Sequence, residues 1–178
     1  MRKVVMPHPF YLALVLLACG QPDPVDEDAV APETAEAVQQ AAVPAAPSGL
    51  VWTFRQQDGA ALFGPPGSPA LSIQCQRPRE GERQLIFVRH LPPTRAGNAT
   101  LSFTGNGQAA SLPVSAVINP GGIGGEWRAM VPPDEHARDV AETFAGPGAV
   151  NVSVTGTPPL VVPSTAEPRR VLADCLGG

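Results

Sequence analysis

The sequence predicts a mainly β domain over residues 49–178: a small antiparallel barrel or sandwich with a short internal helix and a C-terminal helix packed on it. Short stretches in which apolar and polar residues alternate recur along this region, and turns rich in glycine and proline separate them. Only two stretches instead show the helical spacing of apolar residues. About 130 residues bury enough surface for one core, so we expect a single domain.

The first strand places Leu50, Trp52 and Phe54 on one face, and Asp58-Gly59 marks the turn that follows it. The glycine-asparagine-glycine sequence at 105–107 predicts a hairpin between two of the later strands. Further short strands are expected over residues 60–63, 71–75, 84–90, 99–104, 109–117, 126–131, 150–154 and 160–162.

Residues 133–144 are predicted to form the internal helix, since their apolar residues recur at helical spacing and acidic residues occupy the first turn. Residues 164–176 are predicted to form the C-terminal helix. The sequence STAE at 164–167 has the pattern of a capping box, in which Ser164 caps the first turn. The inward face of this helix contains Cys175.

Residues 1–18 have the layout of a secretory signal peptide. Arg2 and Lys3 give a positive start, and residues 10–18 form an unbroken apolar run that ends at Cys19. A membrane-spanning helix needs about 20 apolar residues to cross roughly 30 Å of hydrocarbon. The run is too short for a stable span, so we expect it to direct export.

The residues LLAC at 16–19 resemble the lipobox of bacterial lipoproteins. The resemblance implies cleavage before Cys19 and a diacylglycerol group on its thiol, and two or more acyl chains anchor a protein stably. The mature chain would then lie in the cell envelope and face the periplasm. Gly20, in place of aspartate, favours the outer membrane over the inner one. The alternative is an ordinary signal peptide with an incidental cysteine.

Residues 19–48 are expected to form a disordered tether behind the lipidated cysteine. This segment is rich in alanine and proline, and it carries six acidic residues and no basic one. It has too few large apolar residues to offset its conformational entropy, which favours an extended spacer. The alternative is a segment that folds on a partner. The domain itself has ten acidic residues and ten arginines, and this balance argues against nucleic-acid binding.

Two of the three cysteines remain once the anchor accounts for Cys19. Cys75 lies on the inward face of a predicted strand and Cys175 on that of the last helix, so in an oxidising compartment we expect them to form a disulfide. The alternatives are two buried thiols, or a metal site, which would lack a nearby CxxC or histidine partner. We expect no metal and no cofactor.

No catalytic residue is expected from motifs. His90 ends a strand and His136 begins a helix, and either could be a general base, but no nucleophile elbow or HExxH accompanies them. Both are therefore interpreted as surface residues. The glycine-rich stretch 119–125 precedes a strand and lacks phosphate-loop spacing, which indicates a loop. The charged residues of 77–83 are interpreted as a solvated hairpin tip, and those of 134–142 as the wet face of a helix.

Several structural residues follow one another in a distinctive order: Trp52, DG at 58–59, FGPP at 63–66, LxIxC at 71–75, Arg89, LxxP at 160–163 and Cys175. This order resembles that of small envelope proteins of alphaproteobacteria, especially sphingomonads. The resemblance implies the β fold, the disulfide and the compartment, and it carries no catalytic residue.

These observations predict a non-enzymatic envelope lipoprotein whose β domain binds another envelope component, with an unidentified protein as partner. One alternative is a periplasmic inhibitor of a hydrolase such as lysozyme. A second is a hydrolase that uses His90 or His136 with a distant partner. A cleft that gathers a histidine, a carboxylate and a hydroxyl would favour the hydrolase, whereas a protruding loop at 121–125 over a flat surface would favour the other two.

Overall fold

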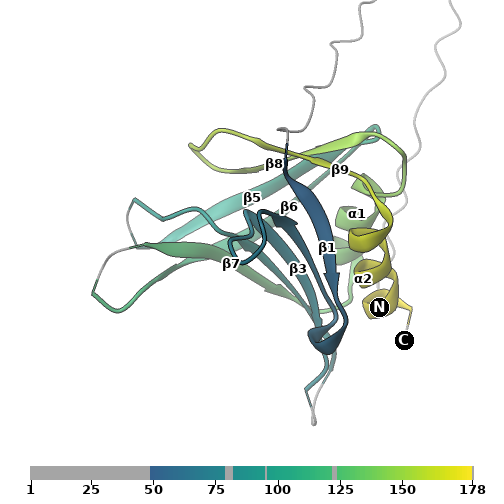
Figure 1. Ribbon diagram of the computed structural model, residues 1–178, viewed down its shortest axis with the longest axis horizontal. Helices are drawn as coiled ribbons and strands as arrows, with labels where there is room; N and C mark the ends of the chain where they lie inside the picture. The colour runs from purple at the N-terminus through teal and green to yellow at the C-terminus, as the bar shows by residue number, and fades with distance from the viewer. Residues whose placement is uncertain (1–48, 79–81, 95, 122–123, 178) are drawn as a thin grey trace, which may run out of the picture. The chain divides into compact units, whose positions relative to one another are not determined.

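The computed structural model describes residues 49–178, apart from 79–81, 95, 122–123 and 178 (Figure 1). The chain divides into two units, Met1–Gln40 and Ala41–Gly178, and the first lies wholly outside the described residues. The predicted signal peptide, the lipidated Cys19 and the tether to residue 48 also lie outside them. Within the described part, no helix is both long and apolar enough to cross a bilayer.

The described residues form a single antiparallel sheet of nine strands, with two α-helices and one short 3-10 helix. The predicted mainly β class is confirmed, and the sheet curls into a half-barrel rather than splitting into a sandwich (Figure 1). Its strand order is β1-β2-β3-β4-β7-β6-β5-β8-β9. The elements in chain order are β1 (Val51–Arg55), η1 (Gln56–Asp58), β2 (Ala60–Gly64), β3 (Leu71–Gln76), β4 (Gln84–Arg89), β5 (Asn98–Gly105), β6 (Gln108–Ile118), β7 (Gly125–Val131), α1 (Glu135–Thr143), β8 (Ala149–Val154), β9 (Leu160–Pro163) and α2 (Ala166–Leu176).

The predicted hairpin between β5 and β6 is confirmed, with a two-residue turn at Asn106 and Gly107. Both residues have positive φ, at 52° and 78°, as a hairpin turn that matches strand twist requires. Gly105 and Gln108, which flank the turn, pair with each other. The Asn106 side chain also bonds two backbone groups beyond the hairpin, so it fixes the turn against the rest of the domain.

A side chain rather than a backbone ladder joins the two edge strands of the sheet. The indole Nε1 of Trp52, on β1, donates to the carbonyl of Pro163, on β9, at 2.7 Å. The Trp52 ring packs against Phe63, with 5.3 Å between ring centroids, and against Phe144, with 6.4 Å. The half-barrel is therefore held closed at this point by one hydrogen bond that is surrounded by aromatic rings.

Both helices pack against the inner face of the sheet, on one side of the molecule (Figure 1). Asp134 is the N-cap of helix α1, and its carboxylate accepts the backbone N–H of Ala137 at 3.2 Å. This bond satisfies a free donor of the first turn. Phe144, just after α1, meets Phe103 edge-on with 6.3 Å between centroids. The two helices and the inner face thus share one hydrophobic core.

The predicted disulfide is confirmed, because Cys75 on β3 is bonded to Cys175 on α2 with Cα atoms 5.5 Å apart, a normal separation for a bridge. Arg77 and Arg83 each donate to the carbonyl of Asp174 at 3.2 Å. These exposed arginines of the β3–β4 hairpin thus also bond a carbonyl in the last turn of α2, where helix carbonyls lack partners of their own.

The predicted capping box at the start of α2 is wrong. The N-cap is Thr165, with no side-chain bond to the first turn, and its hydroxyl bonds the Glu167 carboxylate at 2.5 Å. Ser164 instead donates its hydroxyl to the Phe144 carbonyl at the end of α1. Ser164 is buried there. Leaving a buried carbonyl without a donor costs more free energy than leaving a solvent-exposed helix end uncapped.

Candidate functional site

No described helix covers the face of the sheet opposite α1 and α2, which we call the outer face. Side chains alternate between faces along a strand, so the pairing of Ser72, Val88 and Arg128 across β3, β4 and β7 places these three side chains together on the outer face. Val88 and its neighbour Ile86 are nearly buried although they belong to this face, whereas Met130 is 55% exposed. The outer face is therefore partly apolar.

Three polar side chains meet at one end of the outer face. The Ser72 hydroxyl lies 3.1 Å from Nε2 of His90, and Nδ1 of His90 lies 3.2 Å from Oε2 of Glu126. The pairing of Arg89 with Trp127 sets His90 opposite Glu126, while Ser72 lies diagonally across from His90 on the next strand. The strand order of the sheet thus brings together residues from three separate parts of the sequence.

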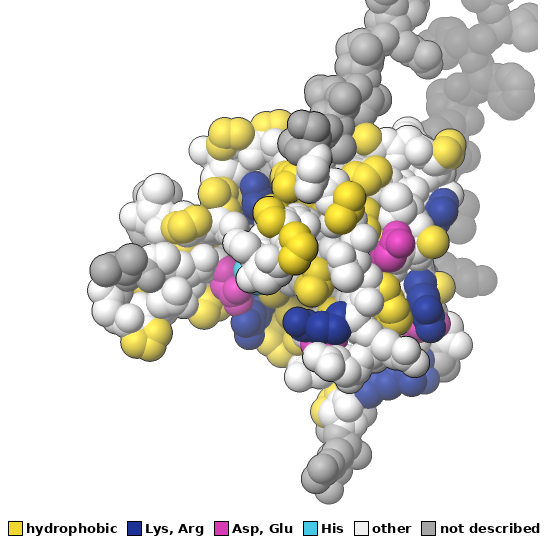
Figure 2. Space-filling view, in the orientation of Figure 1, with side chains coloured by type: hydrophobic (Ala, Val, Ile, Leu, Met, Phe, Trp, Pro, Cys, Tyr) yellow, Lys and Arg dark blue, Asp and Glu magenta, His cyan; other side chains and the backbone are white. Residues whose placement is uncertain are grey.

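Ser72 and His90 line a pocket of about 540 Å³ on this face. The loop between β2 and β3 forms an apolar wall. Just before this loop, Gly64 at the end of β2 has φ of 143° and leaves no room for a Cβ beside Ala70. In Figure 2, hydrophobic side chains gather at the middle of the visible face, and a histidine lies beside acidic side chains at its edge. The other residues that line the pocket are Thr53, Arg55, Leu62, Pro65, Pro66, Gly67 and Pro69.

Burial of the His90 ring lowers its pKa below 6.5, and the positive charges of Arg89 and Arg128 lower it further, while Glu126 opposes them. The ring is therefore neutral near pH 7. Since an ionised carboxylate only accepts hydrogen bonds, Nδ1 carries the proton toward Glu126 and Nε2 is left to accept the Ser72 hydroxyl. Arg128 holds the other oxygen of Glu126.

In this order of contacts a carboxylate fixes the orientation of a base, and the base can activate a hydroxyl. Ser72 lies within β3, not on the strand-to-helix turn of a nucleophile elbow, which is why motif reasoning did not find it. The arrangement can move a proton from the Ser72 hydroxyl to Nε2 of His90. The pocket next to it can hold an apolar group.

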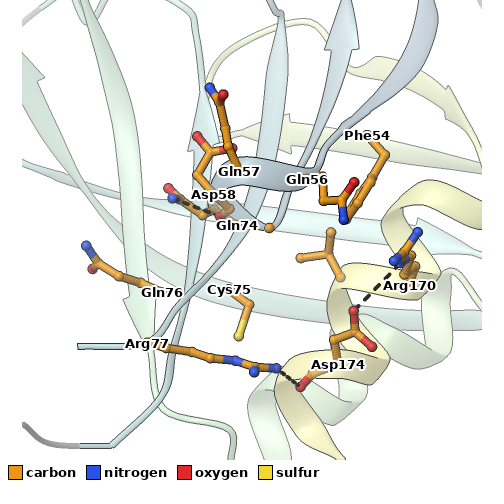
Figure 3. A pocket seen from close by; sticks show the side chains of 12 residues that line it. Phe54, Gln56, Gln57, Asp58, Gln74, Cys75, Gln76, Arg77, Arg170 and Asp174 are labelled. Carbon is orange, nitrogen blue, oxygen red and sulfur yellow. Dashed lines mark hydrogen bonds and ion pairs between the residues drawn. The ribbon is translucent and has the colours of Figure 1, made fainter. Parts of the chain in front are cut away.

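A second cavity, of about 450 Å³, lies where the turn after β1 meets β3 and α2 (Figure 3). The guanidinium of Arg170 lies 4.3 Å from the centre of the Phe54 ring and its Nε lies 3.8 Å from the Asp174 carboxylate. Arg77 points across the cavity and bonds the Asp174 carbonyl, below the Cys75 side chain (Figure 3). These charged groups already hold α2 against the sheet, so we assign the cavity a structural role.

His90 and His136 differ in their surroundings. His136 has a side chain that is 60% exposed and lies 3.7 Å from Asp134, as expected for a surface residue. His90 is half-buried between Ser72 and Glu126, so interpreting it as an ordinary surface residue was wrong. The reason is the β4–β7 pairing, which adjacent sequence does not reveal.

Ser72 and Glu126 are the site residues that the sequence alone did not single out. The available signal was the alternation of side chains along the predicted strands, because it places Ser72 and Glu126 on the outer face. Among the described residues, no group of histidine, cysteine, aspartate or glutamate could hold a metal ion. Part of the glycine-rich stretch, residues 122–123, lies outside the described residues, as does Cys19.

Comparison of the chain with protein-family models, with curated proteins and with solved structures found no match.

Proposed function

We propose that this chain is an envelope lipoprotein that binds an aliphatic group of another envelope component in the Ser72–His90 pocket. The pocket itself carries the proposal. Its volume of about 540 Å³ lies in the range of roughly 300–1,000 Å³ that small-ligand sites occupy. Leu62 and three prolines line it, and apolar walls favour an aliphatic occupant.

The anchor supports the choice of an envelope partner. The LLAC sequence at 16–19 and the apolar run before it would hold the domain beside a membrane. The domain enters its first strand at Val51, which pairs with Gly64 at the rim of the pocket. An anchored chain would therefore keep its pocket within tether reach of membrane-bound components.

A short aliphatic diazirine probe tests the binding site. Membranes that contain the full chain are irradiated with the probe, and labelled peptides are mapped by mass spectrometry. We expect label on the peptides that contain Leu62 and Ser72, and loss of that label in Leu62→Arg, which puts a charge in the pocket. Met130→Arg places the same charge on the outer face away from this pocket, so it should label normally.

Labelling confined to the cavity beside Phe54, or equal in the two arginine variants, would contradict the proposal. Non-reducing mass analysis of the Cys75–Cys175 bond shows whether each variant is folded.

The anchor has its own test. Cys19→Ala should release the chain from membranes or leave it unprocessed, and it should abolish palmitate labelling. Unchanged fractionation would show that lipid does not hold the chain.

A further inference from the structure

We propose that the same pocket hydrolyses esters with a short aliphatic acyl group, with Ser72 as nucleophile, His90 as general base and Glu126 as a positioning residue. The inference rests on the proposed function, because the acyl group is the aliphatic group that the pocket binds. It is the hydrolase alternative for His90, with the substrate class and the partners now assigned.

The geometry meets the requirements of an activated hydroxyl. The distances of 3.1 Å from Ser72 Oγ to His90 Nε2 and 3.2 Å from His90 Nδ1 to Glu126 Oε2 lie within the roughly 2.6–3.2 Å of a nucleophile and its oriented base. Arg128 fixes the carboxylate from its other side. The three groups therefore form one connected line from the pocket to the start of β7.

Burial separates this hydroxyl from ordinary surface serines. Ser72 is 9% exposed, and it lies beneath the proline-rich loop that walls the pocket. An acyl group that fills the pocket would exclude water from the ester carbonyl and hold it beside Ser72. By contrast, Ser102 on β5 and Ser111 on β6 pair with each other, and their hydroxyls form an exposed contact of 3.3 Å without a histidine.

The charge state of His90 suits a general base. Burial lowers the His90 pKa most, Glu126 on β7 raises it, and Arg89, the preceding residue, and Arg128 on β7 lower it. The pKa is therefore below 6.5, and Nε2 is free to accept a proton near pH 7. Arg55, whose Nε and Nη2 are held by Asp58, also lines the pocket.

The reaction proceeds in two steps. Ser72 Oγ attacks the ester carbonyl carbon while His90 Nε2 takes the hydroxyl proton. The bond to the alcohol oxygen then breaks, that oxygen leaves with the proton from His90, and an acyl–Ser72 ester remains. A water molecule attacks this ester in the same way, gives its proton through His90 to Ser72 Oγ, and releases the carboxylic acid.

A short-chain alkyl fluorophosphonate provides the test. The Ser72 oxygen would displace fluoride from phosphorus and leave a stable phosphonyl ester, which peptide mapping locates. With the full chain in lipid nanodiscs we expect one phosphonyl group per chain, on Ser72. Removal of a general base costs roughly 10²–10⁴-fold in rate, so His90→Asn should slow labelling at least 100-fold, and Ser72→Ala should abolish it. Ser111→Ala is the matched control on an exposed hydroxyl and should label normally.

Glu126→Gln separates positioning from mere packing. It should slow labelling less than His90→Asn and move the midpoint of the pH–rate profile to lower pH, because the charge that raises the His90 pKa is lost. A slowed rate with an unmoved profile would assign Glu126 a packing role only and would overturn its part in the proposal.

Hydrolysis and binding can fail separately. Diazirine label in the pocket without phosphonylation of Ser72 would overturn the hydrolytic site and leave the binding site standing. Phosphonyl groups spread over exposed serines, or labelling of His90→Asn at the unmodified rate, would also overturn it. Absence of both labels would overturn both proposals.

Discussion

Reduction of the Cys75–Cys175 bond should lower the free energy of unfolding by several kcal/mol. The bond closes a loop with a sequence separation of 100 residues, and in the chain-entropy model a loop of about 100 residues contributes ~4.7 kcal/mol at 25 °C. We expect the folded state to change little, because Val171 and Leu172 of α2 are buried in the core and their packing does not involve the sulfurs. The loss therefore arises almost wholly in the unfolded chain.

Urea denaturation followed by tryptophan fluorescence measures this loss. The Cys19→Ala chain leaves the two bonded cysteines as the only ones, and it is compared before and after reduction. Since domains are stable by only about 5–15 kcal/mol, we expect the midpoint to fall far. The slope against urea should rise, because the open chain exposes more surface on unfolding. The variant with both Cys75→Ala and Cys175→Ala should not respond to reductant.

A loss below about 1 kcal/mol would refute the loop-closure reasoning. So would hydrogen exchange in which reduction exposes the amides of α2 and leaves the strands protected. That result would mean that the bond only fastens the helix locally.

Three further outcomes follow from single side chains. Asn106→Ala should destabilise the domain by about 3 kcal/mol, because alanine is strained in the left-handed backbone and two hydrogen bonds are lost. Asn106→Gly removes only the strain and should recover about 1 kcal/mol in urea titrations. Equal losses in the two variants would show that backbone strain plays no part. Trp52→Phe leaves the Pro163 carbonyl without its donor and should cost about 1–3 kcal/mol, with faster amide exchange in β1; unchanged exchange would deny the bond its closing role. The lowered pKa of His90 means that the folded state binds fewer protons than the unfolded one, so stability should be complete above pH 6.5 and fall as pH drops below it. His90→Asn should flatten that part of the urea midpoint-against-pH curve, and an equally steep curve would place the effect on other groups.

The local features of the fold could be read from the sequence. Asn106 and Gly107 specify their turn through backbone conformations that few other residues adopt, and the alternation in β5 and β6 follows from one buried and one wet face. The inward positions of Cys75 and Cys175 were readable for the same reason, and their pairing followed from them.

The strand order and the site that depends on it could not be read. β4 pairs with β7 across the intervening β5–β6 hairpin, and no local signal specifies which distant strand completes such a sheet. His90 meets Glu126 only through that pairing. The capping-box prediction was wrong for a related reason, because the Ser164 hydroxyl donates to the Phe144 carbonyl, which is distant in sequence.

The disulfide also determines how the domain would carry a mechanical load. A pull that enters before Gly49 runs along a single chain as far as Cys75, where it divides between the chain leading to β4 and the covalent bond to α2. Beyond that junction each path bears only part of the tension. β1, β2 and most of β3 bear all of it, and these strands and their connecting loop build the pocket wall. Tension should therefore act first on β1, β2 and the pocket that they wall, and the core residues of these strands, such as Phe63, should be disturbed together with the pocket.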